Sequence, residues 1–136
     1  MKTVKNLFLV DDDQLFTFLI SKNIEDTELV EKITVFENGL EILNFLKQKK
    51  DTPNELPDII FLDINMPIMD GWQFIENYEK FAHGVNKNIT IYILSSSIFP
   101  RDIEKANKNS LIADYIVKPI PDDKLIALLK NHKKSA

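Results

Sequence analysis

Cysteine is absent from the 136 residues of the sequence. The chain therefore cannot form a disulfide bond or a thiolate metal site, which suits a reducing compartment, and we expect a cytoplasmic protein. No apolar run approaches the roughly 20 residues that cross a bilayer, so no membrane partner is expected. The first apolar segment ends at Asp11, Asp12 and Asp13. Carboxylates at that place do not fit a secretory signal.

Basic residues are outnumbered, with 17 Lys and Arg against 21 Asp and Glu and a formal net charge of −4. Nucleic-acid binding requires a clustered basic face, and the only basic cluster is the C-terminal KNHKKS, so no nucleic-acid partner is expected. A hydrophobic content of 44% and the chain length fit one globular domain, residues 1–136, with one core.

Short runs rich in Leu, Ile, Val and Phe recur along the chain, at residues 6–10, 33–36, 58–62, 89–94 and 115–118. They are continuous rather than alternating, which is typical of parallel strands covered on both faces. Segments of helical periodicity lie between them, the first with a stripe of Leu15, Phe16, Leu19 and Ile20. This order predicts an α/β fold, a doubly wound five-stranded parallel sheet with helices on both faces.

The helix expected at residues 101–107 differs from the others. Only Ile103 and Ala106 form an apolar stripe in this segment. A helix that buries so little should move easily relative to the sheet.

Carboxylates follow the ends of two predicted strands. Asp11 and Asp12 come after the first strand, and Asp63 ends the third. In an open α/β sheet, ligands bind beyond the carboxyl ends of the strands where the strand order reverses. If these two strands are neighbours, the carboxylates converge and oppose one another's ionisation. Mg²⁺ takes oxygen ligands and would relieve this repulsion, so we predict a magnesium site.

A hydroxyl group and a lysine end two further strands. The fourth strand ends in LSSS, with Ser95 as its first serine, and the fifth ends at Lys118. A hydroxyl, an ammonium group and a metal ion around a carboxylate are the groups that transfer and hold a phosphoryl group. The cations neutralise the phosphoryl oxygens while the carboxylate attacks. Asp63 is the predicted nucleophile.

The segments LVDDD, LDINMPIMDG, ILSSS and YIVKP together resemble, in order and spacing, the chemotaxis-regulator-like receiver domain of two-component response regulators. The resemblance implies a flavodoxin-like sheet with strand order 2-1-3-4-5. It also implies a phosphorelay phosphoprotein that receives an aspartyl phosphate from a histidine kinase or phosphotransfer protein, with Mg²⁺ as cofactor. Such a domain is a signalling switch that catalyses only its own phosphorylation and dephosphorylation.

The resemblance assigns residues to the metal and the phosphoryl group. Asp63 corresponds to the phosphoacceptor. Asp11, Asp12 and Asp63 correspond to the metal-binding carboxylates, assisted by the backbone carbonyl of Asn65. Asp13 matches no role in the family and is interpreted as a helix cap.

The remaining assignments concern the response to phosphorylation. Ser95 corresponds to the hydroxyl that bonds the phosphoryl group, and Lys118 to the active-site lysine. Pro119 is expected to follow a cis peptide bond, and Tyr115 corresponds to the switch aromatic. We expect a downstream protein to bind the face formed by the fourth helix, the fifth strand and the fifth helix.

Other interpretations are open for single motifs. DDD before a helix is more often a solvated cap than a metal site, and Trp72 and Tyr115 taken alone indicate packing. DDDQL approaches the D-x-D-x-[TV] motif of Mg²⁺-dependent haloacid-dehalogenase-like phosphatases, but Leu15 stands where Thr or Val belongs. A flavodoxin-like FMN carrier would need a phosphate-binding loop rich in Ser, Thr and Gly after the first strand, and this sequence has three carboxylates there. The conjunction of groups at several strand ends favours a receiver over these alternatives.

The sequence after Lys118 is short, 18 residues to its end at 136. One helix and a short tail fit this length. We therefore expect a stand-alone receiver, monomeric and without a DNA-binding or enzymatic output domain.

Overall fold

The computed structural model describes residues 2–132, and Lys133 and Lys134 of the basic C-terminal segment lie outside the described residues. Its strands are β1 (Val4–Val10), β2 (Val30–Phe36), β3 (Ile59–Leu62), β4 (Thr90–Ser95) and β5 (Ile112–Val117). All neighbouring strands pair in parallel, in the order β2-β1-β3-β4-β5. The predicted sheet and its strand order are confirmed.

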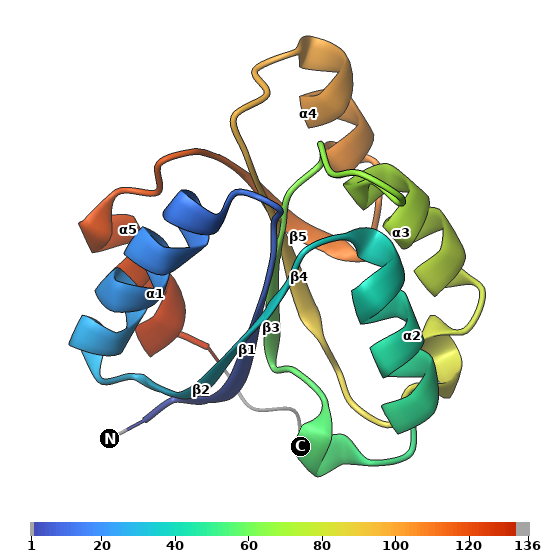
Figure 1. Cartoon of the computed structure of the whole chain (residues 1–136), viewed down its shortest axis with the longest axis horizontal. Coiled ribbons are helices and arrows are strands. Elements are labelled where there is room, and N and C mark those ends of the chain that lie inside the picture. The colour runs from blue at the N-terminus through green and yellow to red at the C-terminus, as the bar shows by residue number, and fades with distance from the viewer. Residues whose placement is uncertain (1, 133–136) are drawn as a thin grey trace.

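Helices cover both faces of this sheet (Figure 1). They are α1 (Gln14–Thr27), α2 (Gly39–Lys49), α3 (Gly71–Glu79), α4 (Pro100–Asn107) and α5 (Asp122–Lys130), with 3-10 turns at Pro53–Glu55 and Ala82–Gly84. One apolar core joins the sheet to α1 and α5, and another joins it to α2, α3 and α4. Within residues 2–132, none of the helices has the length and apolar character needed to cross a bilayer.

Polar side chains set the first turns of three helices. The carboxylate of Asp13 accepts a hydrogen bond from the Phe16 N–H at 3.0 Å, so the interpretation of Asp13 as a cap of α1 is confirmed. Asn38 caps α2 in the same way. Asp70 caps α3 through a reciprocal box, in which its side chain and backbone N–H each bond Gln73. These bonds satisfy N–H groups that have no partner within the helix.

The predicted apolar stripe of α1 is partly wrong. Leu15 and Leu19 are 69% and 52% exposed, whereas Thr17 and Ile20 are buried. Both sets of residues have helical spacing, so periodicity alone does not select the face that meets the sheet. Thr17 tolerates burial because its hydroxyl donates to the Gln14 carbonyl at 3.1 Å.

Helix α4 stands away from the body of the molecule (Figure 1). Ala106 is its only buried residue, and Ile103 is half-buried. The prediction that this helix buries little is confirmed. Its first turn carries Asp102, whose carboxylate accepts hydrogen bonds from the Ser97 hydroxyl and Trp72 Nε1.

Candidate functional site

Three carboxylates meet where β1 and β3 end. Asp11 follows β1 and Asp63 follows β3, which is the neighbouring strand. One carboxylate oxygen from each of Asp11, Asp12 and Asp63 lies within 4.8 Å of the other two. Asp11 and Asp63 are only 5% and 7% exposed, whereas Asp12 is open to solvent. The arrangement is an acidic pocket in which Asp11 and Asp63 are buried and Asp12 faces solvent.

Lys118 reaches this cluster from the residue after β5. Its Nζ lies 2.6 Å from Oδ2 of Asp11 and 3.5 Å from Oδ2 of Asp63. It also lies 4.2 Å from the centroid of the Phe16 ring, and the Lys118–Pro119 peptide bond is cis. One ammonium group against three carboxylates leaves two negative charges. The residues therefore fit a divalent ion such as Mg²⁺, because charge balance and hard oxygen donors are both present.

The Asp63 carboxyl group is held in an environment that disfavours its charge. Burial is the largest influence and raises its pKa, and the charge of Asp11 raises it further. Lys118, the Ser95 hydroxyl and the Ile64 N–H, which donates to Oδ1 at 2.8 Å, lower the pKa without cancelling the rise. A buried carboxylate under this repulsion gains from any reaction or ion that neutralises it.

Ser95 ends β4 and is fully buried. Its Oγ accepts a hydrogen bond from the Ser97 N–H at 3.2 Å. The Ser97 carbonyl in turn accepts from the Tyr115 hydroxyl at 2.7 Å. Burial raises the pKa of Tyr115 still further above neutral pH, and the protonated hydroxyl donates this hydrogen bond. Tyr115 is therefore already bonded to the loop between β4 and α4.

The loop after β3 lies directly against the start of α3. Asn65, whose carbonyl is a predicted metal ligand, belongs to this loop and is exposed. The Gly71 N–H donates to the Ile64 carbonyl at 2.8 Å, and a Cβ at Gly71 would overlap the carbonyl oxygen of Asp63. A glycine at this position thus lets the helix approach the backbone that carries Asp63.

Sequence patterns did not identify Asp102 as a neighbour of the site and assigned Trp72 to packing. In the structure, Oδ2 of Asp102 accepts from the Ser97 hydroxyl at 2.6 Å, and its Oδ1 accepts from Trp72 Nε1 at 3.1 Å. Trp72 and Asp102 lie on different helices, 30 residues apart. No local pattern signals a contact of this range.

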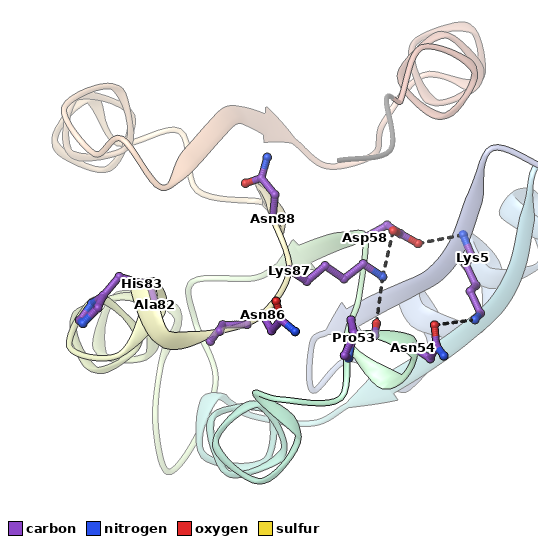
Figure 2. Close-up of a pocket in the computed structure, with 10 residues that line it drawn as sticks. Lys5, Pro53, Asn54, Asp58, Ala82, His83, Asn86, Lys87 and Asn88 are labelled. Carbon is purple, nitrogen blue, oxygen red and sulfur yellow. Dashed lines mark hydrogen bonds and ion pairs between the residues drawn. The ribbon is translucent and has the colours of Figure 1, made fainter. Parts of the chain in front are cut away.

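A separate hollow of about 750 Å³ lies at the opposite edge of the sheet, near the starts of β1, β3 and β4 (Figure 2). On its wall, Oδ1 of Asp58 pairs with Lys87 Nζ at 3.0 Å, and Oδ2 accepts from the backbone N–H groups of Lys5 and Asn6 at 2.9 and 3.0 Å. Burial acts to raise the pKa of Asp58, but these bonds together outweigh it and lower the pKa. Asp58 and these partners satisfy one another's charges and hydrogen bonds. They therefore hold the starts of the strands together and do not provide reactive groups.

A family model described as the response regulator receiver domain matches residues 7–130. Among curated proteins, the transcriptional regulatory protein YpdB of Escherichia coli K12 is 28% identical over 91% of this chain. The chain covers 46% of YpdB, so it spans less than half the length of that relative.

Solved structures resemble the chain over nearly its whole length. A two component response regulator from Cytophaga hutchinsonii has a TM-score of 0.84 and 30% identity, with 95% of this chain and 96% of that chain covered. A response regulator receiver protein from Dyadobacter fermentans has a TM-score of 0.79 and 26% identity, with 96% and 99% covered. The predicted resemblance is confirmed by the family model and by these structures.

Proposed function

Because this chain belongs to the response regulator receiver domain family, we propose that it accepts a phosphoryl group on Asp63 from a histidine kinase or phosphotransfer protein. The observation that carries this proposal is the environment of Asp63. Its buried carboxylate lies within 4.8 Å of two other carboxylates and 3.5 Å from the ammonium group of Lys118. This arrangement provides a nucleophile together with groups that bind a phosphoryl dianion.

The chemistry is an in-line transfer from a phosphohistidine. A carboxylate oxygen of Asp63 forms the new O–P bond as the N–P bond of the donor breaks, and the donor imidazole keeps the electron pair. Lys118 and Ser95 bind the phosphoryl oxygens. Asp11, Asp12, Asp63 and the carbonyl of Asn65 would hold Mg²⁺, which supplies positive charge for the transferring oxygens. Attack of water on the same phosphorus later releases phosphate and restores the carboxylate.

The alternative of a haloacid-dehalogenase-like phosphatase has no support. Its nucleophile would be Asp11, but the carboxylate of Asp11 is buried and engaged by Lys118 at 2.6 Å. Oδ1 of Asp11 also accepts the Asp13 N–H at 2.9 Å. Asp63 is also buried, but its contact with Lys118 is longer, at 3.5 Å, so Asp11 is the more tightly held of the two carboxylates and suits the role of a ligand.

The signal is proposed to leave through the face formed by α4, β5 and α5. Arg101 and Lys105 are exposed on α4, and Lys108 is exposed at its C-cap. A protein with an acidic or mixed-charge groove fits these cations. Because α4 buries only Ala106, a change at the β4–α4 loop can move this helix at small cost.

The nucleophile is tested by labelling with acetyl phosphate and Mg²⁺, followed by borohydride reduction and peptide mass spectrometry. We expect the modified residue to be Asp63 and expect Asp63→Asn to lose the label. Asp13→Asn is the matched control, since Asp13 caps α1 outside the carboxylate cluster, and it should be labelled like the wild type. Modification at Asp11 would overturn the proposal in favour of the phosphatase.

A further inference from the structure

Ser97 holds the β4–α4 loop through all of its polar groups. Its N–H donates to Ser95 Oγ at 3.2 Å, its hydroxyl donates to Asp102 at 2.6 Å, and its carbonyl accepts from Tyr115 at 2.7 Å. Ser97 itself is only 8% exposed. Loops are ordinarily the more mobile parts of a domain. These bonds tie the β4–α4 loop, residues 96–99, to both α4 and β5.

The hydrogen bond from the Ser97 N–H limits which other hydrogen bonds the Ser95 hydroxyl can form. A serine hydroxyl has one hydrogen to donate and two lone pairs to accept with. Because Ser95 Oγ accepts from the Ser97 N–H, its hydrogen remains available to donate. Ser95 ends β4, the strand that pairs with β3, and Asp63 follows β3, so this hydrogen is at the same edge of the sheet as the Asp63 carboxylate.

Asp102 in turn determines where Ser97 lies. Its two carboxylate oxygens are used separately, Oδ2 by the Ser97 hydroxyl at 2.6 Å and Oδ1 by Trp72 Nε1 at 3.1 Å. Hydrogen bonds to a charged acceptor are stronger than neutral ones. Asp102 is also in the first turn of α4, where the helix dipole favours a carboxylate. The carboxylate is therefore anchored to α3 and can hold the loop.

We propose that Asp102 is a positioning residue for the phosphoryl-accepting site: through Ser97 it holds the Ser95 hydroxyl in the orientation that donates to a phosphoryl group on Asp63. The inference rests on the proposed function and adds a residue that lies outside the acidic pocket. Without Asp102, Ser97 loses the acceptor of its hydroxyl and the loop samples other positions. The fraction of molecules ready to bind the phosphoryl group falls, and the apparent affinity falls by the same factor.

The test measures binding of beryllofluoride, a phosphoryl mimic, by ¹⁹F NMR in the presence of Mg²⁺. We expect Asp102→Ala to bind about tenfold more weakly, the equivalent of one charge-assisted hydrogen bond. Asp102→Asn keeps an acceptor oxygen for Ser97 and should stay within about threefold of the wild type. Glu104→Ala is the matched control on α4, since Glu104 pairs only at the surface with Lys108 at 2.9 Å, and its affinity should not change.

Two further measurements separate positioning from general loss of structure. Mg²⁺ affinity without beryllofluoride should be the same in Asp102→Ala and the wild type, because the carboxylate cluster is intact. In a Ser95→Ala background, Asp102→Ala should cause no further loss, because Asp102 acts through Ser95. If Asp102→Ala does not fold, Ser97→Ala removes the same hydrogen bond from the other side and should show the same weakening.

Unchanged beryllofluoride affinity in folded Asp102→Ala or Ser97→Ala would overturn the inference and leave the proposed function standing. The inference is equally overturned if the tenfold loss persists in the Ser95→Ala background or if Mg²⁺ affinity falls in parallel. If wild-type protein binds no beryllofluoride at all, the proposed function fails, and the inference fails with it.

Discussion

Two buried aspartates, Asp58 and Asp63, each lie beside a lysine, but their pKa values shift in opposite directions. Burial acts to raise both. At Asp58, backbone N–H groups and the pair with Lys87 outweigh burial and lower the pKa. At Asp63, the charge of Asp11 adds to burial, and the pKa is raised. The charge of Asp58 therefore stabilises the fold at neutral pH, whereas the charge of Asp63 lowers stability and leaves a group ready to be neutralised.

Replacing Asp58 by alanine should lower the free energy of unfolding at pH 7 by about 3 kcal/mol, because Lys87 is left without its buried partner. Since the folded-state pKa is lowered, the contribution of Asp58 is fully present above its unfolded pKa of about 3.9 and is lost as pH falls through the folded value. When both proteins are unfolded in urea, the difference between their free energies of unfolding should therefore narrow below about pH 4.

Glu55→Ala is the matched control for this change. Glu55 lies near the same edge and pairs with Lys49 at 3.3 Å, but this pair is 35% and 50% exposed. The surface pair should contribute less than about 1 kcal/mol. Equal losses of unfolding free energy in Asp58→Ala and Glu55→Ala would contradict the structural role given to Asp58.

At the scale of elements, α2 and α4 differ in how firmly they are held. Helix α2 buries Ile42, Leu43 and Leu46, whereas α4 buries only Ala106. Apolar burial is the main term that fixes a helix to a sheet. Helix α4 therefore depends more on polar contacts, and those of Asp102 in its first turn lie nearest the phosphoryl-accepting site.

Hydrogen exchange of the backbone amides should show this difference when beryllofluoride and Mg²⁺ are added. We expect altered exchange rates across residues 96–118, which include α4 and β5, because the β4–α4 loop responds to the phosphoryl mimic. Residues 38–50, which include α2, should change little and serve as the internal reference. A change confined to residues 64–70 would mean that α4 does not respond and that partners contact the acidic pocket directly.

For the molecule as a whole, the acidic pocket joins loops that are far apart in the chain. Asp11 and Asp12 follow β1, Asp63 follows β3, and Lys118 follows β5. These groups come together only when the sheet is assembled, so an ion that they bind stabilises the entire folded state.

Raising Mg²⁺ should therefore raise the melting temperature of the wild type. At an Mg²⁺ concentration 100 times the dissociation constant, mass action adds about 2.7 kcal/mol to the free energy of unfolding. Asp12→Ala should respond much less, since it removes one ligand at an exposed position. Asp13→Asn keeps an acceptor for the cap and should respond like the wild type in differential scanning fluorimetry. Identical responses of Asp12→Ala and wild type would rule out Asp12 as a ligand.

Local patterns in the sequence determined the parallel sheet and the group of side chains at its carboxyl edge, whereas the strand order was implied by the family resemblance. Continuous apolar runs mark parallel strands, and the polar residue that follows each run must lie at one edge. For this reason the sequence predicts that Asp11, Asp63 and Lys118 converge, and in the structure Lys118 Nζ lies 2.6 Å from Asp11 and 3.5 Å from Asp63. The sequence also indicates Asp13 as a cap, and a cap can be recognised locally because it bonds a residue only three positions away.

Tertiary structure alone decided the contacts that join distant elements. The bond between Trp72 and Asp102 and the pair of Asp58 with Lys87 link residues about 30 positions apart, and no periodicity connects such positions. The apolar stripe predicted for α1 is partly wrong for the same reason, since two sets of residues have helical spacing and only packing against the sheet selects Ile20 over Leu19. Local hydrogen bonds and periodicity act over a few residues, whereas these choices depend on which elements the assembled sheet brings side by side.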